Sequence, residues 1–88
     1  MNISDVSDGR VMADEILGVI REEGIVELAD GFGAGDDLFE AGLDSMAVMQ
    51  LLVAAGERFG VTLEVGDVTK ENFATAEALA RLIGARIS

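Results

Sequence analysis

The sequence of 88 residues contains no cysteine, histidine, tyrosine, tryptophan or proline. Without cysteine the chain can form neither a disulfide framework nor a thiolate zinc site. Without histidine it lacks the most common general base and the most common nitrogen ligand for metals, and it cannot build the serine–histidine or cysteine–histidine pairs that activate nucleophiles. These absences argue against a self-sufficient enzyme, and we expect neither catalytic nor metal-binding residues.

Basic residues are also scarce. Six Lys and Arg stand against 17 Asp and Glu, which gives a net charge of −11 and an isoelectric point near 4.1. Such a surface repels nucleic-acid backbones and anionic membranes, so we expect neither as a partner and expect a basic protein instead. The charge is uneven, because residues 1–44 hold twelve acids and two basic residues while residues 45–88 hold five and four. The change falls at Ser45.

Long apolar runs are missing as well. No stretch approaches the roughly 20 apolar residues that a membrane span needs, and the first ten residues contain acids rather than the basic start of a signal peptide. Half of the residues are apolar, which is enough for the core of one domain over residues 1–88, with ordered structure over about 8–87. We therefore expect a single cytoplasmic, monomeric domain, and the acidic start at Met1 favours a freestanding chain.

The hydrophobic spacing predicts an all-α, four-helix bundle with a long loop between the first and second helices and a short third helix. The first helix is expected to begin at a cap on Ser7 or Asp8 and to end at about Glu23. The second is expected to run from near Asp44 to about Phe59.

The remaining segments are assigned from local patterns. Residues 25–35 lose helical periodicity and are rich in glycine, which predicts a loop. Residues 61–65 alternate like a strand but have no pairing partner, so we interpret them as an extended connection. The short third helix is expected over residues 67–72, and Thr75 is expected to cap the last helix.

The second helix has two apolar sides instead of the usual one. The first side consists of Val48, Leu51, Leu52, Ala55 and Phe59. The second consists of Met46, Met49 and Val53, roughly 140° away around the helix. Either protein surrounds this helix, with the methionines as further core, or the second side is an exposed docking face. Because complete burial of one helix is difficult in so small a domain, we favour the docking face.

The start of this helix combines a good cap with a serine. Asp44 is a suitable N-cap, and Ser45 would be the first helical residue, with its hydroxyl near the positive end of the helix dipole. A phosphate ester at that position would lie near unpaired backbone N–H groups, which favour an anion. Taken alone, however, a serine in a first turn is usually only a polar surface residue.

The residues around Ser45 form a longer motif that indicates a function for this serine. The run over residues 37–46 reads Asp-Leu-Phe-Glu-Ala-Gly-Leu-Asp-Ser-Met, and it resembles the attachment motif of the acyl carrier and peptidyl carrier protein family. The resemblance extends over most of the chain, from the opening helix to the end of the second helix. It implies that a phosphopantetheinyl transferase attaches 4′-phosphopantetheine from coenzyme A to Ser45, and that the chain carries cargo as a thioester on this arm. The chain itself would not be an enzyme.

The resemblance also implies a surface for partners. Family partners dock on the start of the second helix and on the loop before it, which places Leu43, Asp44, Met46, Met49 and Val53 in the contact. Asp36, Asp37 and Glu40 would join Asp44 in an acidic rim that steers a basic partner, although solvation or helix capping explains each acid equally well. The partners implied are the transferase, an acyl or aminoacyl ligase, and an acyltransferase or ketosynthase.

The second helix departs from the carriers of fatty-acid synthesis, which are rich in acids there. Beyond Ser45 this helix has a single acid, Glu57. The motif and residues 72–75 look more like discrete carriers of specialised pathways, so we expect polyketide or mixed polyketide–peptide (antibiotic-type) biosynthesis. The alternatives are an aminoacyl carrier loaded by a dedicated ligase, a fatty-acid-synthesis carrier, or an acidic helical adaptor without a covalent group. The sequence leaves the cargo open.

Overall fold

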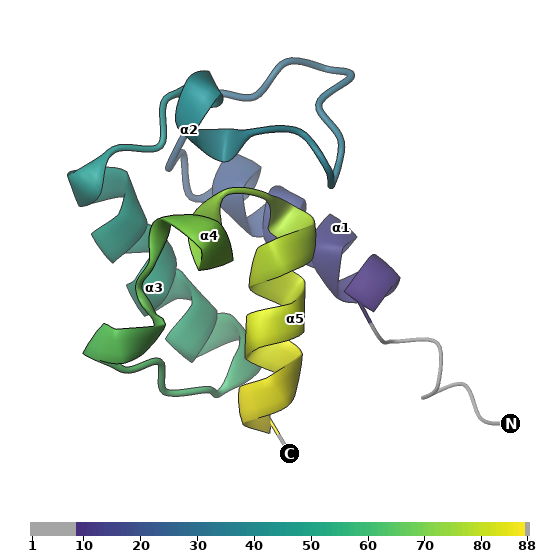
Figure 1. Cartoon of the computed structure of the whole chain (residues 1–88). Helices are drawn as coiled ribbons and strands as arrows, with labels where there is room; N and C mark the ends of the chain where they lie inside the picture. The colour runs from purple at the N-terminus through teal and green to yellow at the C-terminus, as the bar shows by residue number, and fades with distance from the viewer. Residues whose placement is uncertain (1–8, 88) are drawn as a thin grey trace, which may run out of the picture.

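The structure, a computed structural model, describes residues 9–87 of the chain, and within them all regular secondary structure is helical (Figure 1). In chain order the elements are α1 (Gly9–Glu22), α2 (Leu38–Ala41), α3 (Ser45–Phe59), the 3₁₀ helix η2 (Val65–Asp67), α4 (Lys70–Phe73) and α5 (Ala76–Ile87). This arrangement confirms the predicted all-α bundle of the carrier type. The expected cap at Ser7 or Asp8 lies outside the described residues. Among the helices of the described part, none has the length and apolar character to cross a membrane.

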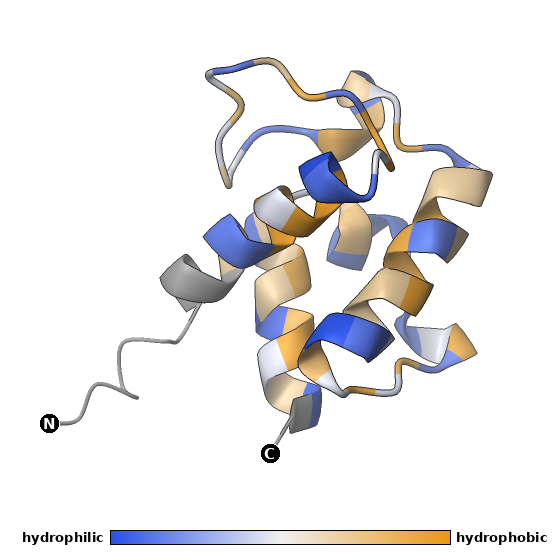
Figure 2. Cartoon of the chain, turned by 180° about the vertical axis from the view of Figure 1, so that it is seen from behind, coloured by the Kyte–Doolittle hydropathy of each residue, from blue (hydrophilic) through white to orange (hydrophobic). Residues whose placement is uncertain are grey.

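A single core joins all of these helices. Figure 2 shows hydrophobic and hydrophilic sides on the long helices, and α1 makes its largest contact with α5. The largest fully buried side chains are Ile16 and Ile20 of α1, Leu38 of α2, Leu51 of α3, Phe73 of α4, and Leu79 and Ile83 of α5. The short helices α2 and α4 therefore each contribute an anchor to this core. Burial of the two anchors holds these helices in place, although each helix is too short to be stable alone.

The long connection between α1 and α3 is tied to the other end of the chain. The backbone N–H of Glu77 donates to the carbonyl of Ala34 at 3.0 Å, and the N–H of Leu38 donates to the carbonyl of Ala74 at 2.7 Å. These two bonds hold the loop and α2 against the junction of α4 and α5. The sequence did not predict α2, because four residues show no periodicity and its position depends on these long-range bonds.

The predicted third helix over residues 67–72 was wrong in its boundaries. The segment instead forms η2 and α4, which Val68 and Thr69 separate. Thr69 caps α4 by accepting the N–H of Asn72 at 3.1 Å, so α4 begins as a separate helix after the turn. The extended connection predicted over residues 61–65 ends one residue earlier, because Val65 begins η2. The Thr75 cap is as predicted, since the Thr75 hydroxyl accepts the N–H of Ala78 at 3.0 Å.

Two ion pairs join segments that are far apart in the sequence. Arg58 near the end of α3 contacts Glu22 at the end of α1, on the surface. Arg86 in the last turn of α5 donates two hydrogen bonds to the carboxylate of Asp67. Its Nε lies 3.1 Å from Oδ2, and its Nη2 donates to Oδ1. Asp67 is only 7% exposed, and among the residues whose burial is described it is the single buried charged one. The same Oδ2 accepts the backbone N–H of Glu64 at 3.0 Å. A buried carboxylate needs such partners, because burial without them is costly.

Replacing Asp67 by Asn should remove part of the acid dependence of folding. Hydrogen bonds from the Arg86 side chain and from the backbone of Glu64 lower the pKa of Asp67 below its ordinary value of about 3.9. The stabilisation is therefore complete above about pH 4 and is lost as the pH falls below it toward the lowered pKa. Urea unfolding curves of both proteins should show the larger difference in unfolding free energy at about pH 7 and a smaller one at about pH 3. An equal difference at the two pH values would contradict this prediction.

Candidate functional site

The first turn of α3 is built as the sequence predicts. Asp44 has extended backbone angles and caps the helix, with its carboxylate accepting the N–H of Ala47 at 2.9 Å. Ser45 is the first helical residue and is exposed. Its hydroxyl therefore lies at the positive end of a 15-residue helix, where an outside enzyme can reach it and where the helix dipole and the backbone N–H groups of the first turn favour an attached phosphate.

The approach of the chain to Ser45 is fixed by α2. Gly42 ends α2 with a φ of 120°, a value that favours glycine, and its N–H donates to the carbonyl of Phe39 at 3.1 Å. Leu43 follows, and its N–H donates to the carbonyl of Leu38 at 3.0 Å. The side chain of Leu43 is 3% exposed and belongs to the core. Burial makes Leu43 an anchor of the start of α3, and its expected contact with partners stays a prediction.

A groove of about 550 Å³ lies beside Ser45. Its walls come from α2, from the first two turns of α3, and from the segment that leads into α4, which lie close together in Figure 1. The lining residues are Phe39, Leu43, Asp44, Ser45, Val48, Met49, Val68, Thr69 and Phe73. Asp44 is the single charged residue among them, so the groove offers a mainly apolar surface next to the serine hydroxyl.

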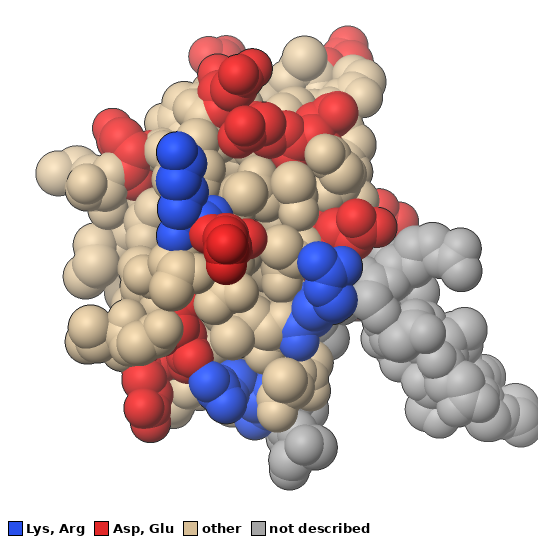
Figure 3. Space-filling view, in the orientation of Figure 1, with Lys and Arg blue, Asp and Glu red and all other residues tan. Residues whose placement is uncertain are grey.

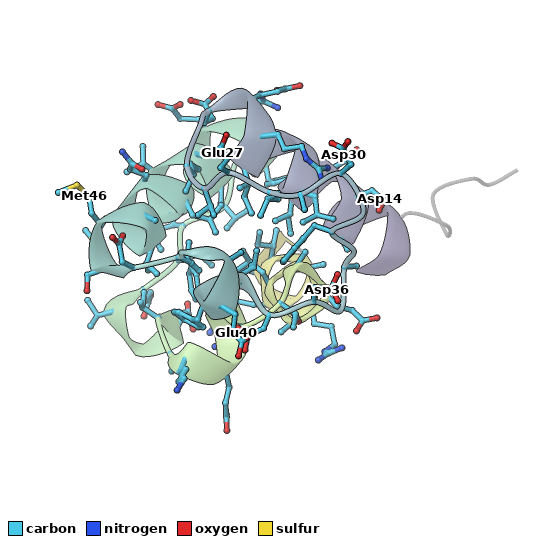
Figure 4. All side chains as sticks on the ribbon, turned by 90° about the horizontal axis from the view of Figure 1, so that it is seen from above. Asp14, Glu27, Asp30, Asp36, Glu40 and Met46 are labelled. Carbon is cyan, nitrogen blue, oxygen red and sulfur yellow. The ribbon has the colours of Figure 1, made fainter. Side chains whose placement is uncertain are left out.

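The second apolar side of α3 faces solvent. Met46 is 71% exposed, Met49 57% and Val53 59%, and Figure 4 shows Met46 pointing away from the bundle. Their exposure excludes the alternative in which the methionines are further core. Val48, Leu51 and Ala55, on the opposite side, are buried as expected. We call Met46, Met49 and Val53 the methionine ridge. An exposed apolar ridge of this kind, rimmed by polar groups, is typical of a protein–protein contact.

The predicted acidic residues are all exposed, but three of them also bind backbone groups. Asp36 accepts the N–H of Gly33 at 2.8 Å, and Asp37 caps α2 by accepting the N–H of Phe39 at 2.9 Å. Asp44 caps α3, as described, whereas Glu40 is an exposed side chain of α2. The capping acids remain exposed while they accept these bonds, so capping and steering of a basic partner are compatible.

Two further acids belong to the same region. Glu27 and Asp30 lie on the loop between α1 and α2, and Figure 4 shows them pointing outward around the same end of the bundle as Asp36 and Glu40. Figure 3 shows acidic side chains most densely over this end. Glu27 and Asp30 were not predicted as part of the acidic rim, although the excess of acids before Ser45 was the available signal. In the described part of the chain, no group of three or more potential ligands is arranged to hold a metal ion.

Comparisons with known proteins agree with this geometry. Residues 14–83 match the family model described as a phosphopantetheine attachment site. The chain is 36% identical over 70 residues to the D-alanyl carrier protein of Streptococcus suis (strain 05ZYH33), an alignment that covers 75% of this chain and 82% of that protein.

A solved structure has a similar fold. A chain in the crystal structure of an engineered Bradyrhizobium japonicum glycine:[carrier protein] ligase, complexed with carrier protein from Agrobacterium tumefaciens and ATP, aligns with a TM-score of 0.73. The alignment covers 84% of this chain and 97% of the matched chain at 24% identity, which shows a shared fold.

Two replacements of Asp44 should separate the stabilisation due to its capping hydrogen bond from the stabilisation due to its negative charge. Asp44→Ala should lower the unfolding free energy by about 1 kcal/mol, because the N–H of Ala47 loses its acceptor. Asp44→Asn should retain most of that stability, since the amide oxygen can accept the same bond without the charge. Chemical denaturation of the three proteins measures both effects. If the alanine variant were as stable as the parent, the cap would not contribute to the start of α3.

Proposed function

The chain belongs to the acyl and peptidyl carrier protein family with a phosphopantetheine attachment site, and we propose that it carries aminoacyl groups as thioesters on an arm attached to Ser45. Membership in this family establishes that the chain is a carrier with covalently attached 4′-phosphopantetheine and is not itself catalytic. The proposal adds the attachment residue and the class of cargo.

The assignment of Ser45 rests chiefly on its uniqueness within the matched region. Residues 14–83 contain one serine, and this serine is exposed at the capped start of α3. Its hydroxyl is open to a modifying enzyme, and the helix N-terminus favours the phosphate group that the arm brings. No histidine exists in the chain to activate the hydroxyl, so the transferase would have to take its proton.

The arm supplies the chain with a thiol that can hold cargo as a thioester. The polypeptide has no cysteine, so it has no thiol of its own. The chain's own residues would do the rest. Asp44 fixes the first turn and Ser45 anchors the arm, while the groove beside Ser45 and the methionine ridge offer contact surface to partner enzymes.

The relatives favour an amino acid as cargo. The Streptococcus suis relative is a D-alanyl carrier protein, and the matched fold comes from a complex of a carrier protein with a glycine:[carrier protein] ligase. These relatives support the alternative of an aminoacyl carrier loaded by a dedicated ligase over our first expectation of polyketide or polyketide–peptide biosynthesis. They equally give no support to fatty-acid synthesis.

The methionine ridge and the acids around it suit a partner with an apolar patch and basic surroundings. Methionine side chains adapt to different surfaces, which fits a carrier that must meet a transferase and a ligase in turn. The net charge of −11 would increase the rate of encounter with a basic partner, and added salt would reduce it.

Attachment at Ser45 is tested by mass spectrometry. Incubation of the chain with coenzyme A, Mg²⁺ and a broad-specificity phosphopantetheinyl transferase should add the mass of one phosphopantetheinyl group. Ser45→Ala should abolish the increase, because the matched residues contain no second serine. Ser88→Ala is the matched control and should be modified like the parent. An adaptor without a covalent group would show no increase in any of the three proteins.

The cargo is tested with the modified carrier. Incubation with ATP and glycine or D-alanine, together with an ATP-dependent ligase of the matching specificity, should add one aminoacyl group that hydroxylamine releases. Malonyl and acyl donors with their acyltransferases form the comparison arm. Loading only from the malonyl or acyl donors would overturn the aminoacyl assignment and leave the attachment at Ser45 intact.

Shortening the methionine ridge should weaken partner binding. The double variant Met46→Ala, Met49→Ala should raise the KM of the transferase for the carrier by about tenfold, because exposed apolar anchors dominate such contacts. Val65→Ala is the matched control, since Val65 is an exposed apolar residue outside both the ridge and the groove. Steady-state kinetics with the carrier as the varied substrate measure the effect. An unchanged KM in the double variant would show that the transferase docks elsewhere.

A further inference from the structure

The ion pair between the buried Asp67 and the half-exposed Arg86 lies outside the site described so far, but it adjoins one wall of that site. Val68 and Thr69 follow Asp67 directly, and both line the groove beside Ser45. The side chain of Arg86 comes from the last turn of α5, far from Ser45 in the sequence. The pair therefore connects the end of the chain to the surroundings of the serine.

The hydrogen bonds around Asp67 hold this wall from several directions. Its carboxylate accepts from Arg86 and from the backbone of Glu64, as described for the fold. Its carbonyl accepts the N–H of Thr69 at 3.0 Å and the side-chain amide of Asn72 at 2.9 Å. Asp67 thus fixes both the turn that carries Val68 and Thr69 and the first turn of α4. Its own position depends on Arg86, whose planar fork gives a more exact placement than a single charge would.

The opposite wall of the groove is anchored by Leu38, which is fully buried in the core. Phe39 of α2 forms part of that wall, and α2 is held by the bond from Leu38 to the carbonyl of Ala74 at 2.7 Å. Loss of Arg86 would therefore release one wall while the other wall and the Asp44 cap remain in place. The change would alter the shape of the groove without moving the serine itself.

We propose that Arg86 is a positioning residue for the attachment reaction: through Asp67 it holds Val68 and Thr69 in the shape that the phosphopantetheinyl transferase contacts beside Ser45. An enzyme that reaches the hydroxyl at the edge of this groove must cover the groove's rim, and a displaced rim reduces the fit. Arg86 touches no reacting atom, so its loss weakens the encounter complex and leaves the chemical step unchanged. The inference rests on the proposed attachment at Ser45.

The surface ion pair between Arg58 and Glu22 provides a matched control. Arg58 and Arg86 each pair with a carboxylate from another element, and their side chains are similarly exposed, at 43% and 47%. Arg58 joins α3 to α1 and is absent from the lining of the groove beside Ser45. Truncation of Arg58 removes its pairs with Glu22 and Glu23, away from the groove, whereas truncation of Arg86 removes the pair with Asp67 beside it.

The test measures transferase kinetics at a temperature where urea curves show every variant to be folded, so that loss of folded carrier does not raise the apparent KM. Arg86→Ala should raise the KM for the carrier about three- to tenfold with kcat unchanged, and Asp67→Asn should change it in the same direction. Arg86→Lys should fall between Arg86→Ala and the parent, because lysine keeps the charge but not the fork. Arg58→Ala should match the parent. Amide hydrogen exchange at Val68 and Thr69 should accelerate in Arg86→Ala and not in Arg58→Ala.

Three results would overturn the inference, and they differ in what else they affect. An unchanged KM in Arg86→Ala, with the parent modified at Ser45, would remove the role of Arg86 and leave the proposed function standing. An equal rise in Arg86→Ala and Arg58→Ala would mean that general loosening, not the groove wall, governs the transferase. A parent that the transferase does not modify would overturn the proposed function and this inference together.

Discussion

The capped start of α3 is the constraint on which the site depends, because it sets both where the helix begins and which way Ser45 faces. Asp44 satisfies the N–H of Ala47, and the buried Leu43 anchors the residue just before the cap. A shift of the sequence by one residue along this helix would turn every side chain by about 100° and carry the methionine ridge toward the core. The long-range bond from Leu38 to Ala74 then fixes this whole corner against the end of α4. One short stretch of chain thereby positions the serine, the ridge and one wall of the groove.

The features that follow from local chemistry could be predicted from the sequence. An aspartate before an apolar-periodic segment predicts a cap, and the structure has Asp44 at that position with Ser45 as the first helical residue. The two apolar sides of α3 were also visible, because a helix of known period assigns each residue a direction. Exposure of Met46 and Met49 follows from the size of the domain, since so few elements cannot surround α3 completely.

The features that depend on distant residues could not be predicted. Leu43 stands between a glycine and an aspartate, and only the fold shows that it is buried rather than part of the exposed surface. The division of residues 65–73 into η2 and α4 depends on Asp67, whose partner Arg86 is 19 residues away. A charged residue in a polar turn looks solvent-exposed in the sequence, and no periodicity marks it as buried. The groove beside Ser45 was missed for the same reason, since three separate segments form it.

The absence of cysteine and histidine and the long-range contacts of Asp67 both bear on how a carrier works. A thioester in transit must survive until the receiving enzyme binds, and a chain without cysteine or histidine has no thiolate or imidazole with which to attack it. The same lack of reactive side chains means that the polypeptide offers partners no thiolate or imidazole to bind. The recognition features proposed above are shape and charge near Ser45, namely the methionine ridge, the acids of the loop and the groove rim. Such features are useful only if they are held rigidly, because a mobile rim would have to be ordered at each encounter and binding would be weakened accordingly. The ion pair of the buried Asp67 fits this requirement, because its contacts add order at the groove rim, where Val68 is half-buried and Thr69 is exposed.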